Sequence, residues 1–139
     1  MHVLVVDDNL DNQHLVSAVL ERDGFTVEVA ETASVALRCV KDHRPDLILM
    51  DIQLAGEDGL ALTRRLKARP FSASIPVVAL SAHAMAAHKE EALDAGCAGY
   101  ITKPIDTRTF AGQVKRFLNV STKVQVESAN RHAQEASKP

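Results

Sequence analysis

The stretch Val3-Leu4-Val5-Val6-Asp7-Asp8 is a short, mostly β-branched apolar run that ends in two adjacent carboxylates. A continuous apolar run of this length is typical of a strand that is buried on both faces of a parallel sheet. Three later apolar runs also end in a polar side chain, at Asp51, Ser81 and Lys103. Because the carboxyl ends of parallel strands share one edge of the sheet, where α/β proteins bind ligands, we expect these side chains to converge.

Apolar runs alternate with helical patterns along the whole chain. We expect strands at about residues 3–6, 25–30, 47–50, 75–80 and 99–102, and helices at about residues 11–22, 33–43, 59–68, 85–95 and 107–118. This alternation predicts an α/β fold, a doubly wound five-stranded parallel sheet with helices on both faces and right-handed crossovers.

Side-chain spacing predicts which faces of these elements are buried. Leu15 and Val19 lie one turn apart in the first predicted helix, and we expect both on its inner face. The alternation of Phe25, Val27 and Val29 indicates a strand with one less buried face, as at a sheet edge. Polar residues that can cap helices precede three of the predicted helices: Thr32, Asp58 and Asp106.

Composition limits the class of protein. The chain has 139 residues, of which 46% are hydrophobic, and this suits one domain with a substantial core. We assign the domain to residues 1–119 and interpret the polar segment 120–139 as a tail or linker. A net charge of −2 without a basic block argues against direct nucleic-acid binding. No apolar run is long enough to span a bilayer and no secretory signal is visible, so we expect no membrane contact and a cytoplasmic protein.

The cysteines and histidines show no metal-binding spacing. Cys39 and Cys97 are interpreted as reduced thiols. The six histidines are interpreted as solvated surface side chains, since neither His14 nor His43 has an obvious partner in the sequence. Among the six, His83 lies two residues beyond Ser81 and could shield that region.

The predicted cluster of carboxylates, Asp7, Asp8 and Asp51, requires a cation. At roughly 4 Å and an effective dielectric constant near 20, each like-charge pair costs about 4 kcal/mol. Oxygen ligands at a water-accessible edge suit Mg²⁺. With one divalent ion and Lys103 the formal charges sum to zero, and a phosphoryl group on Asp51 would change the sum to only about −1. This is the chemistry of a metal-dependent phosphoryl acceptor.

Four segments together resemble the receiver domains of two-component response regulators. They are Val-Leu-Val-Val-Asp-Asp-Asn at 3–9, Leu-Ile-Leu-Met-Asp-Ile-Gln-Leu at 47–54, Ala-Leu-Ser-Ala-His-Ala-Met at 79–85 and Ala-Gly-Tyr-Ile-Thr-Lys-Pro-Ile-Asp at 98–106. The resemblance covers about residues 2–119, and order, spacing and placement at strand ends all agree. It implies a flavodoxin-like sheet with strand order 2-1-3-4-5.

The resemblance also implies a metal site and a phosphoacceptor. Asp51 corresponds to the phosphoacceptor and also to a ligand of Mg²⁺ (or Mn²⁺). Asp8 corresponds to a direct metal ligand, Asp7 to a helper that often acts through water, and Gln53 to the backbone carbonyl that completes the protein's share of the coordination shell.

The same resemblance implies a switch and its partners. Ser81 matches the switch hydroxyl, Tyr100 the switch aromatic and Lys103 the phosphate-binding lysine, followed by a cis bond to Pro104. The expected donor is a histidine kinase or a histidine phosphotransfer domain, and the expected output is a downstream protein partner. Such a protein is a signalling switch that assists its own phosphoryl transfer and dephosphorylation. It could be a stand-alone receiver or part of a hybrid kinase.

Some residues depart from the family pattern, and two other functions compete. Ala55 stands where a proline is frequent and Glu57 where an apolar residue is frequent, which bears on metal affinity and phosphate lifetime. A haloacid dehalogenase-type phosphohydrolase would carry Asp-x-Asp after the first strand and a cap insertion, for which the chain has no room. A flavin-binding electron carrier would have an uncharged phosphate-binding loop in place of the Asp7-Asp8 pair.

Overall fold

The computed structural model describes residues 1–54, 56, 58–82 and 86–118, so the predictions for Ala55, Glu57, His83 and segment 120–139 lie outside it. The strands are β1 (His2–Val6), β2 (Thr26–Ala30), β3 (Leu47–Asp51), β4 (Val77–Ser81) and β5 (Gly99–Thr102). The helices are α1 (Leu10–Arg22), α2 (Ala33–His43), α3 (Gly59–Lys67), α4 (Ala86–Asp94) and a C-terminal helix over residues 110–118. Within these residues no helix is long and apolar enough to cross a membrane.

The five strands form one parallel sheet in the order β2-β1-β3-β4-β5, which confirms the predicted fold. The order reverses between β1 and β3, and the carboxyl ends of these two neighbours open the crevice where such sheets bind ligands. β2 and β5 form the two edges. The partial exposure of Val27 and Val29 agrees with the edge position predicted for that strand.

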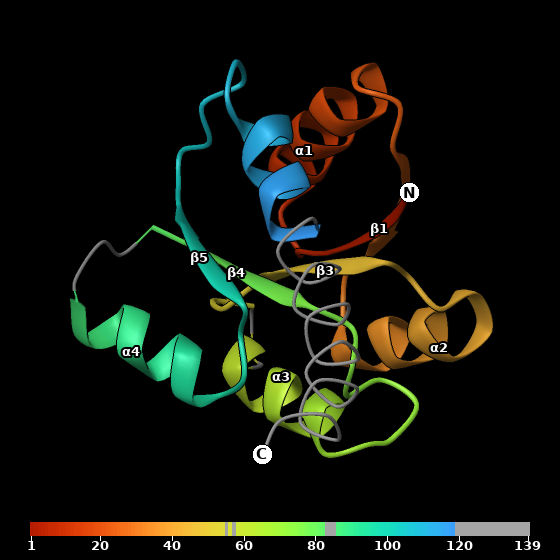
Figure 1. The fold of residues 1–139 in the computed structure, drawn as a ribbon, viewed down its shortest axis with the longest axis vertical. Coiled ribbons are helices and arrows are strands. Elements are labelled where there is room, and N and C mark those ends of the chain that lie inside the picture. The colour runs from red at the N-terminus through yellow and green to blue at the C-terminus, as the bar shows by residue number, and fades with distance from the viewer. Residues whose placement is uncertain (55, 57, 83–85, 119–139) are drawn as a thin grey trace, which may run out of the picture.

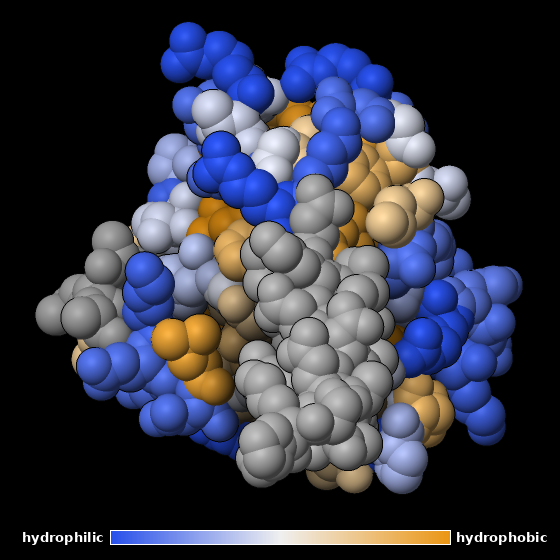
Figure 2. Space-filling model, in the orientation of Figure 1, coloured by the Kyte–Doolittle hydropathy of each residue, from blue (hydrophilic) through white to orange (hydrophobic). Residues whose placement is uncertain are grey.

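Helices cover both faces of the sheet, and each face has its own apolar core (Figure 1). One core joins the sheet to α2, α3 and α4 through residues such as Val40, Leu66 and Ala92. The other joins it to α1 and the C-terminal helix through Leu20 and Phe110. The outer helices present mainly hydrophilic side chains on the face drawn in Figure 2. Val114 and Leu118 are buried with Phe110, so the C-terminal helix packs on the sheet through one apolar stripe.

One predicted helix face was partly wrong. Val19 of α1 is buried as expected, but Leu15 is 41% exposed and Val16 occupies the inner face in its place. Two consecutive apolar residues fit a helical period of 3.6 equally well in either position, so the pattern alone could not choose between them. The structure adds Gln13, a polar residue, to the buried face.

The predicted caps explain where the helices begin. The side chains of Thr32 and Asp58 accept hydrogen bonds from the backbone N–H groups of Val35 and Leu60. Such caps satisfy N–H groups that have no partner inside the helix. At Asp106 the side chain accepts from Arg108 N at 2.9 Å, so this residue also caps a turn. Several element ends differ from prediction by one or two residues, as in β4, which starts after Pro76.

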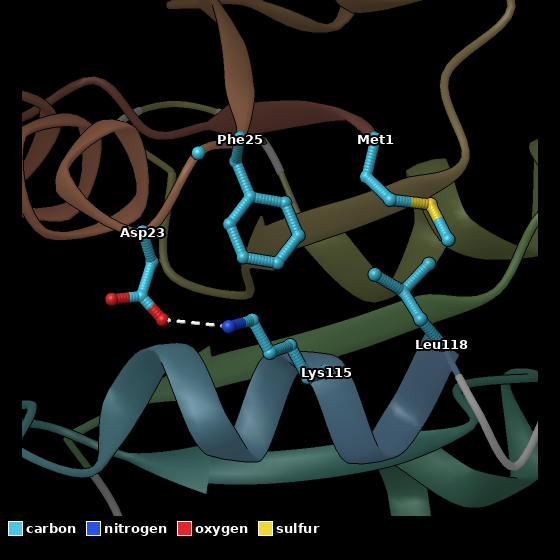
Figure 3. Close-up of a pocket in the computed structure, with 6 residues that line it drawn as sticks. Met1, Asp23, Phe25, Lys115 and Leu118 are labelled. Carbon is cyan, nitrogen blue, oxygen red and sulfur yellow. Dashed lines mark hydrogen bonds and ion pairs between the residues drawn. The ribbon is translucent and has the colours of Figure 1, made fainter.

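The amino ends of β1 and β2 meet the C-terminal helix around a small cavity of about 190 Å³ (Figure 3). Lys115 of that helix donates to Asp23, which follows α1, at 2.8 Å. This hydrogen bond and the positive charge of Lys115 lower the pKa of Asp23. The ion pair therefore links the two helices that cover this face of the sheet.

Candidate functional site

Two buried carboxylates and one lysine meet at the carboxyl ends of the strands. Asp7 follows β1 and is fully buried, and Asp51 ends β3 with 4% exposure. Lys103, just after β5, places its Nζ 3.4 Å from Oδ2 of Asp7 and 3.1 Å from Oδ2 of Asp51. The structure thus brings together three residues that are up to 96 positions apart in the sequence.

Asp8 completes an acidic group at the same edge. One carboxylate oxygen from each of Asp7, Asp8 and Asp51 lies within 4.8 Å of the others. Asp8 is exposed, whereas the other two are buried, so the cluster is open to solvent on the side of Asp8. An all-oxygen set that is open to water on one side suits Mg²⁺, which retains several of its water ligands.

Backbone hydrogen bonds fix the two buried carboxylates. Oδ1 of Asp7 accepts from Asn9 N at 2.8 Å, and Oδ1 of Asp51 accepts from Gln53 N at 2.9 Å. In both residues Oδ2 faces Lys103, so the two oxygens of each carboxylate have different partners. Each carboxylate is therefore oriented before any ligand arrives.

The buried amide of Gln13 also supports the site, although no pattern in the sequence indicated it. Its Nε2 donates to the backbone carbonyl of Asp7 at 2.6 Å and so ties α1 to the end of β1. Gln13 is 5% exposed. A glutamine between polar residues of a helix is expected at the surface. Its contact with Asp7 becomes visible only once α1 is placed against the sheet.

Burial disfavours the charged form of the Asp7 carboxyl. Desolvation raises the pKa of the Asp7 carboxyl above its usual value, and the neighbouring Asp51 carboxylate raises it further. The Asn9 hydrogen bond and the charge of Lys103 oppose this rise. Burial is the largest effect, so the net direction is upward, and a bound cation would relieve it.

Ser81 and Tyr100 lie on the neighbouring strands β4 and β5. Ser81 is fully buried at the end of β4, and its backbone carbonyl accepts from Lys103 N at 2.7 Å. Tyr100 is half-buried against the core that includes α4. The Lys103–Pro104 bond is cis, as predicted. Both predicted switch residues therefore adjoin the segment that carries the lysine.

Gly59, the first residue of α3, allows this helix to approach the site. A Cβ atom on Gly59 would clash with the backbone carbonyl of Asp51 and would lie 2.6 Å from Cα of Ile52. Both obstacles are backbone atoms, which cannot move aside cheaply. Glycine is required here because of this contact, whereas the sequence indicated only a helix start after Asp58.

The interpretation of all histidines as solvated was wrong for His2, whereas His43 is exposed as expected but has a partner that the sequence did not indicate. Nδ1 of His43 lies 3.3 Å from Oε2 of Glu28, and Nε2 of His2 lies 3.9 Å from Oε1 of the same carboxylate. The side chain of His2 is only 25% exposed. The sequence could not predict these contacts, because His2, Glu28 and His43 lie on three different elements that meet only in the folded protein.

Comparison with known proteins places the chain among signalling proteins. The family model described as "Response regulator receiver domain" matches residues 3–115. The polar-differentiation response regulator DivK of Brucella anthropi is 39% identical over 116 residues, covering 84% of this chain and 94% of DivK.

Solved structures of receiver domains also superpose closely on the chain. The receiver domain of NtrX from Brucella abortus has a TM-score of 0.78 and 33% identity, covering 84% of this chain and 98% of that domain. The signal receiver domain of a histidine kinase from Syntrophus aciditrophicus has a TM-score of 0.76 and 32% identity, covering 85% and 89%.

Proposed function

Because the chain belongs to the response regulator receiver domains, we propose that Asp51 accepts a phosphoryl group from a phosphohistidine and thereby switches a protein-binding surface. The observation that carries this proposal is the position of Asp51. Its carboxylate is nearly buried at the end of β3, 3.1 Å from the Lys103 ammonium and beside the carboxylates of Asp7 and Asp8. This position offers the Asp51 carboxylate both a cation and a metal-binding group.

The residues at the site suit phosphoryl transfer. An Asp51 oxygen attacks phosphorus, the bond from phosphorus to the donor's imidazole nitrogen breaks, and that nitrogen keeps the electron pair. Asp8, Asp7, Asp51 and the carbonyl of Gln53 would hold Mg²⁺, which stabilises charge on the transferring group. Lys103, already in contact with Asp51, can form an ion pair with the phosphoryl oxygens and balance the negative charge that they add. The same groups would orient water for dephosphorylation.

Ser81 and Tyr100 would carry the change to the surface. A phosphoryl group on Asp51 offers new acceptor oxygens to the Ser81 hydroxyl, and an inward shift of Ser81 would make room for Tyr100. Tyr100 and Phe117 line a depression of about 530 Å³ between β5 and the C-terminal helix. We assign the downstream partner to this surface together with α4.

The donor is proposed to be a histidine kinase or a histidine phosphotransfer domain that docks beside α1. Leu10 and Leu15 of this helix are 59% and 41% exposed, which gives the donor an apolar contact close to the site. Residues 1–119 would form the receiver domain, followed by a polar tail or linker. Stand-alone and kinase-linked receivers are both consistent with the relatives described above.

The test is the intact mass of the protein after incubation with a small phosphodonor such as acetyl phosphate. We expect a single phosphoryl adduct in the presence of Mg²⁺ and none with a chelator. Asp51→Asn should lose the adduct, and Asp94→Asn, at the end of α4, is the matched control and should keep it. An adduct of equal yield on Asp51→Asn would overturn the assignment of the acceptor.

Lys103→Ala separates phosphorylation from switching. The variant keeps the acidic group, so we expect some adduct to form, but phosphorylation should no longer change the affinity for a downstream partner. A wild-type response in this variant would show that Lys103 plays no part in the switch.

A further inference from the structure

A second group of ligand-type side chains lies at the opposite end of the sheet. It consists of His2 on β1, Glu28 on β2, and Cys39 and His43 on α2. Two imidazole nitrogens approach the two oxygens of the Glu28 carboxylate, at 3.9 Å from His2 and 3.3 Å from His43. The same carboxylate acts on the Cys39 thiol and helps to raise its pKa.

The fold explains why these four residues meet. Leu4 of β1 pairs with Glu28 of β2, so His2, two residues before Leu4, points to the same face of the sheet as Glu28. This is the face covered by α2. Cys39 and His43 are four residues apart and therefore share one side of that helix. Two strands and one helix thus each direct ligand-type atoms to the same place.

The contact between His2 and Glu28 is incomplete in a way that suggests a ligand. Nε2 of His2 and Oε1 of Glu28 are both buried, and neither has a hydrogen-bond partner in the described part of the chain. Their separation of 3.9 Å is too long for a hydrogen bond. Buried polar atoms are nearly always paired, so two such atoms facing each other call for a bridging group.

We propose that His2, Glu28, Cys39 and His43 bind a divalent ion of the Zn²⁺ type. Two ligand atoms about 2.1 Å from a tetrahedral ion lie about 3.4 Å apart. The distance of 3.3 Å from His43 to Glu28 is close to this value, and the distance of 3.9 Å from His2 to Glu28 must shorten when the ion binds. Imidazole and thiolate ligands favour Zn²⁺ over Mg²⁺, which distinguishes this group from the all-oxygen group around Asp51.

The electrostatic balance supports a cation here. A carboxylate at Glu28 and a thiolate at Cys39 would neutralise a divalent ion, with both histidines neutral. The group also lies at the C-terminal end of α2, where the helix dipole favours positive charge. Two arginines adjoin the group in sequence. Arg44, next to His43, donates to Ser74 Oγ at 2.6 Å, and Arg38, next to Cys39, is exposed to solvent and acts to lower the pKa of that thiol.

Binding requires one proton to leave and one side chain to turn. Burial and Glu28 raise the pKa of the Cys39 thiol to about 11, so the S–H bond breaks as the metal–sulfur bond forms and the proton passes to solvent. Among the described residues only the acidic group already has three ligand atoms within 4.8 Å. The ring of His43, which is 67% exposed beside an open depression of about 540 Å³, can turn inward to close the new site.

The experiment titrates the full chain with Co²⁺ and Zn²⁺ in an Asp8→Ala background, which weakens the acidic site. Tetrahedral Co²⁺ absorbs strongly in the visible region, and a Co²⁺–thiolate bond adds a near-ultraviolet band. We expect one equivalent of ion with both signals, reversed by Zn²⁺. His2→Gln and His43→Gln should each weaken Zn²⁺ binding at least tenfold, and Cys39→Ser should remove the near-ultraviolet band.

His14→Gln is the matched control, since His14 is an exposed histidine on α1, and it should bind Zn²⁺ like its parent. Far-UV circular dichroism shows whether each variant is folded. If His2→Gln and His43→Gln bind Zn²⁺ as tightly as the parent, or if the Asp8→Ala protein binds no Co²⁺, the proposal is wrong. Neither result bears on phosphorylation of Asp51, which the intact-mass experiment tests separately.

Discussion

The two ends of the sheet hold charged groups in opposite ways. At the carboxyl ends, Asp7 and Asp51 are almost fully buried and Lys103 lies between them. At the amino end, Glu28 and His43 keep 29% and 67% of their side chains exposed. Along the strand, roughly 16 Å separates His2 from Asp7, and roughly 10 Å separates Asp7 from Leu4, which pairs with Glu28, at about 3.3 Å per residue.

The difference shows that burial determines whether the side chains of a site are ordered before a ligand binds. Backbone hydrogen bonds fix the carboxyl-end group, so its side chains are ordered before a ligand binds. Because burial raises the pKa of Asp7, the charged form of this group destabilises the folded protein when no cation is bound. The amino-end group is more exposed to water, although Nε2 of His2 and Oε1 of Glu28 are buried without a hydrogen-bond partner among the described residues, and it must rearrange to bind an ion. Four measurements test this difference between the two ends of the sheet.

The largest effect is expected from Gly59→Ala. The added methyl group would press on the backbone of Asp51 and Ile52, so we expect a loss of about 3 kcal/mol in unfolding free energy and little phosphorylation. Urea unfolding measures the loss. Gly112→Ala is the control, because its Cβ would meet nothing within 4 Å in the C-terminal helix, and it should stabilise the protein by about 0.5–1 kcal/mol. Equal effects of the two changes would refute the tight contact at the carboxyl end.

Mg²⁺ should stabilise the folded protein by binding at the carboxyl ends of the strands and not at the amino end. Binding to the folded state adds about 1.4 kcal/mol when the ion is present at ten times its dissociation constant. We expect this gain in the wild-type protein, its removal by a chelator, and its loss in Asp8→Ala. Thermal unfolding with and without Mg²⁺ gives the answer. A gain that survives in Asp8→Ala would place the ion elsewhere.

The raised pKa of Asp7 makes the metal-free protein less stable as pH rises. The folded protein holds the Asp7 proton more tightly than the unfolded chain, so unfolding free energy falls from about pH 4 up to the raised pKa. Asp7→Asn removes this fall and should be more stable at pH 7 by an amount on the order of 1 kcal/mol. At pH 4 the two proteins should be nearly equal. A constant difference across the range would contradict burial as the cause.

The smallest effect is expected at the amino end. Without added transition metal, Glu28→Gln should change unfolding free energy by less than about 1 kcal/mol, since partly exposed ion pairs contribute little. A change as large as that of Gly59→Ala would mean that the two ends of the sheet do not differ as described. Urea unfolding in the presence of a chelator is the suitable measurement.

The sequence predicted the fold and the meeting of Asp7, Asp8, Asp51 and Lys103 because both depend on where apolar runs end. A strand buried on both faces needs a continuous apolar run, and a parallel sheet then aligns the residues that follow. The family match decides against the hydrolase and the electron carrier considered from the residues alone.

What the sequence could not predict depends on contacts between distant elements. The choice between Leu15 and Val16, the close approach of Gly59 to Asp51 and the partners of Glu28 all follow from the packing of one element on another. In each case the local sequence pattern either fitted two arrangements or gave no indication of the contact. Polar residues at the interface of a helix and a sheet are the least visible of all, because they interrupt the apolar periodicity that reveals the helix.

The carboxylate of Glu28, which is turned toward the sheet face, also bears on whether the open edge of the sheet can pair with another molecule. β2 is an edge strand, and its free backbone N–H and C=O groups could pair with a strand from another molecule. A strand that paired with β2 would lie beside Glu28 and reduce the contact of its side chain, now 29% exposed, with water. Charge turned toward the sheet face is one of the means by which natural proteins prevent edge-to-edge aggregation. Replacing Glu28 by valine would therefore remove a barrier to self-association while leaving the fold of the single chain nearly unchanged.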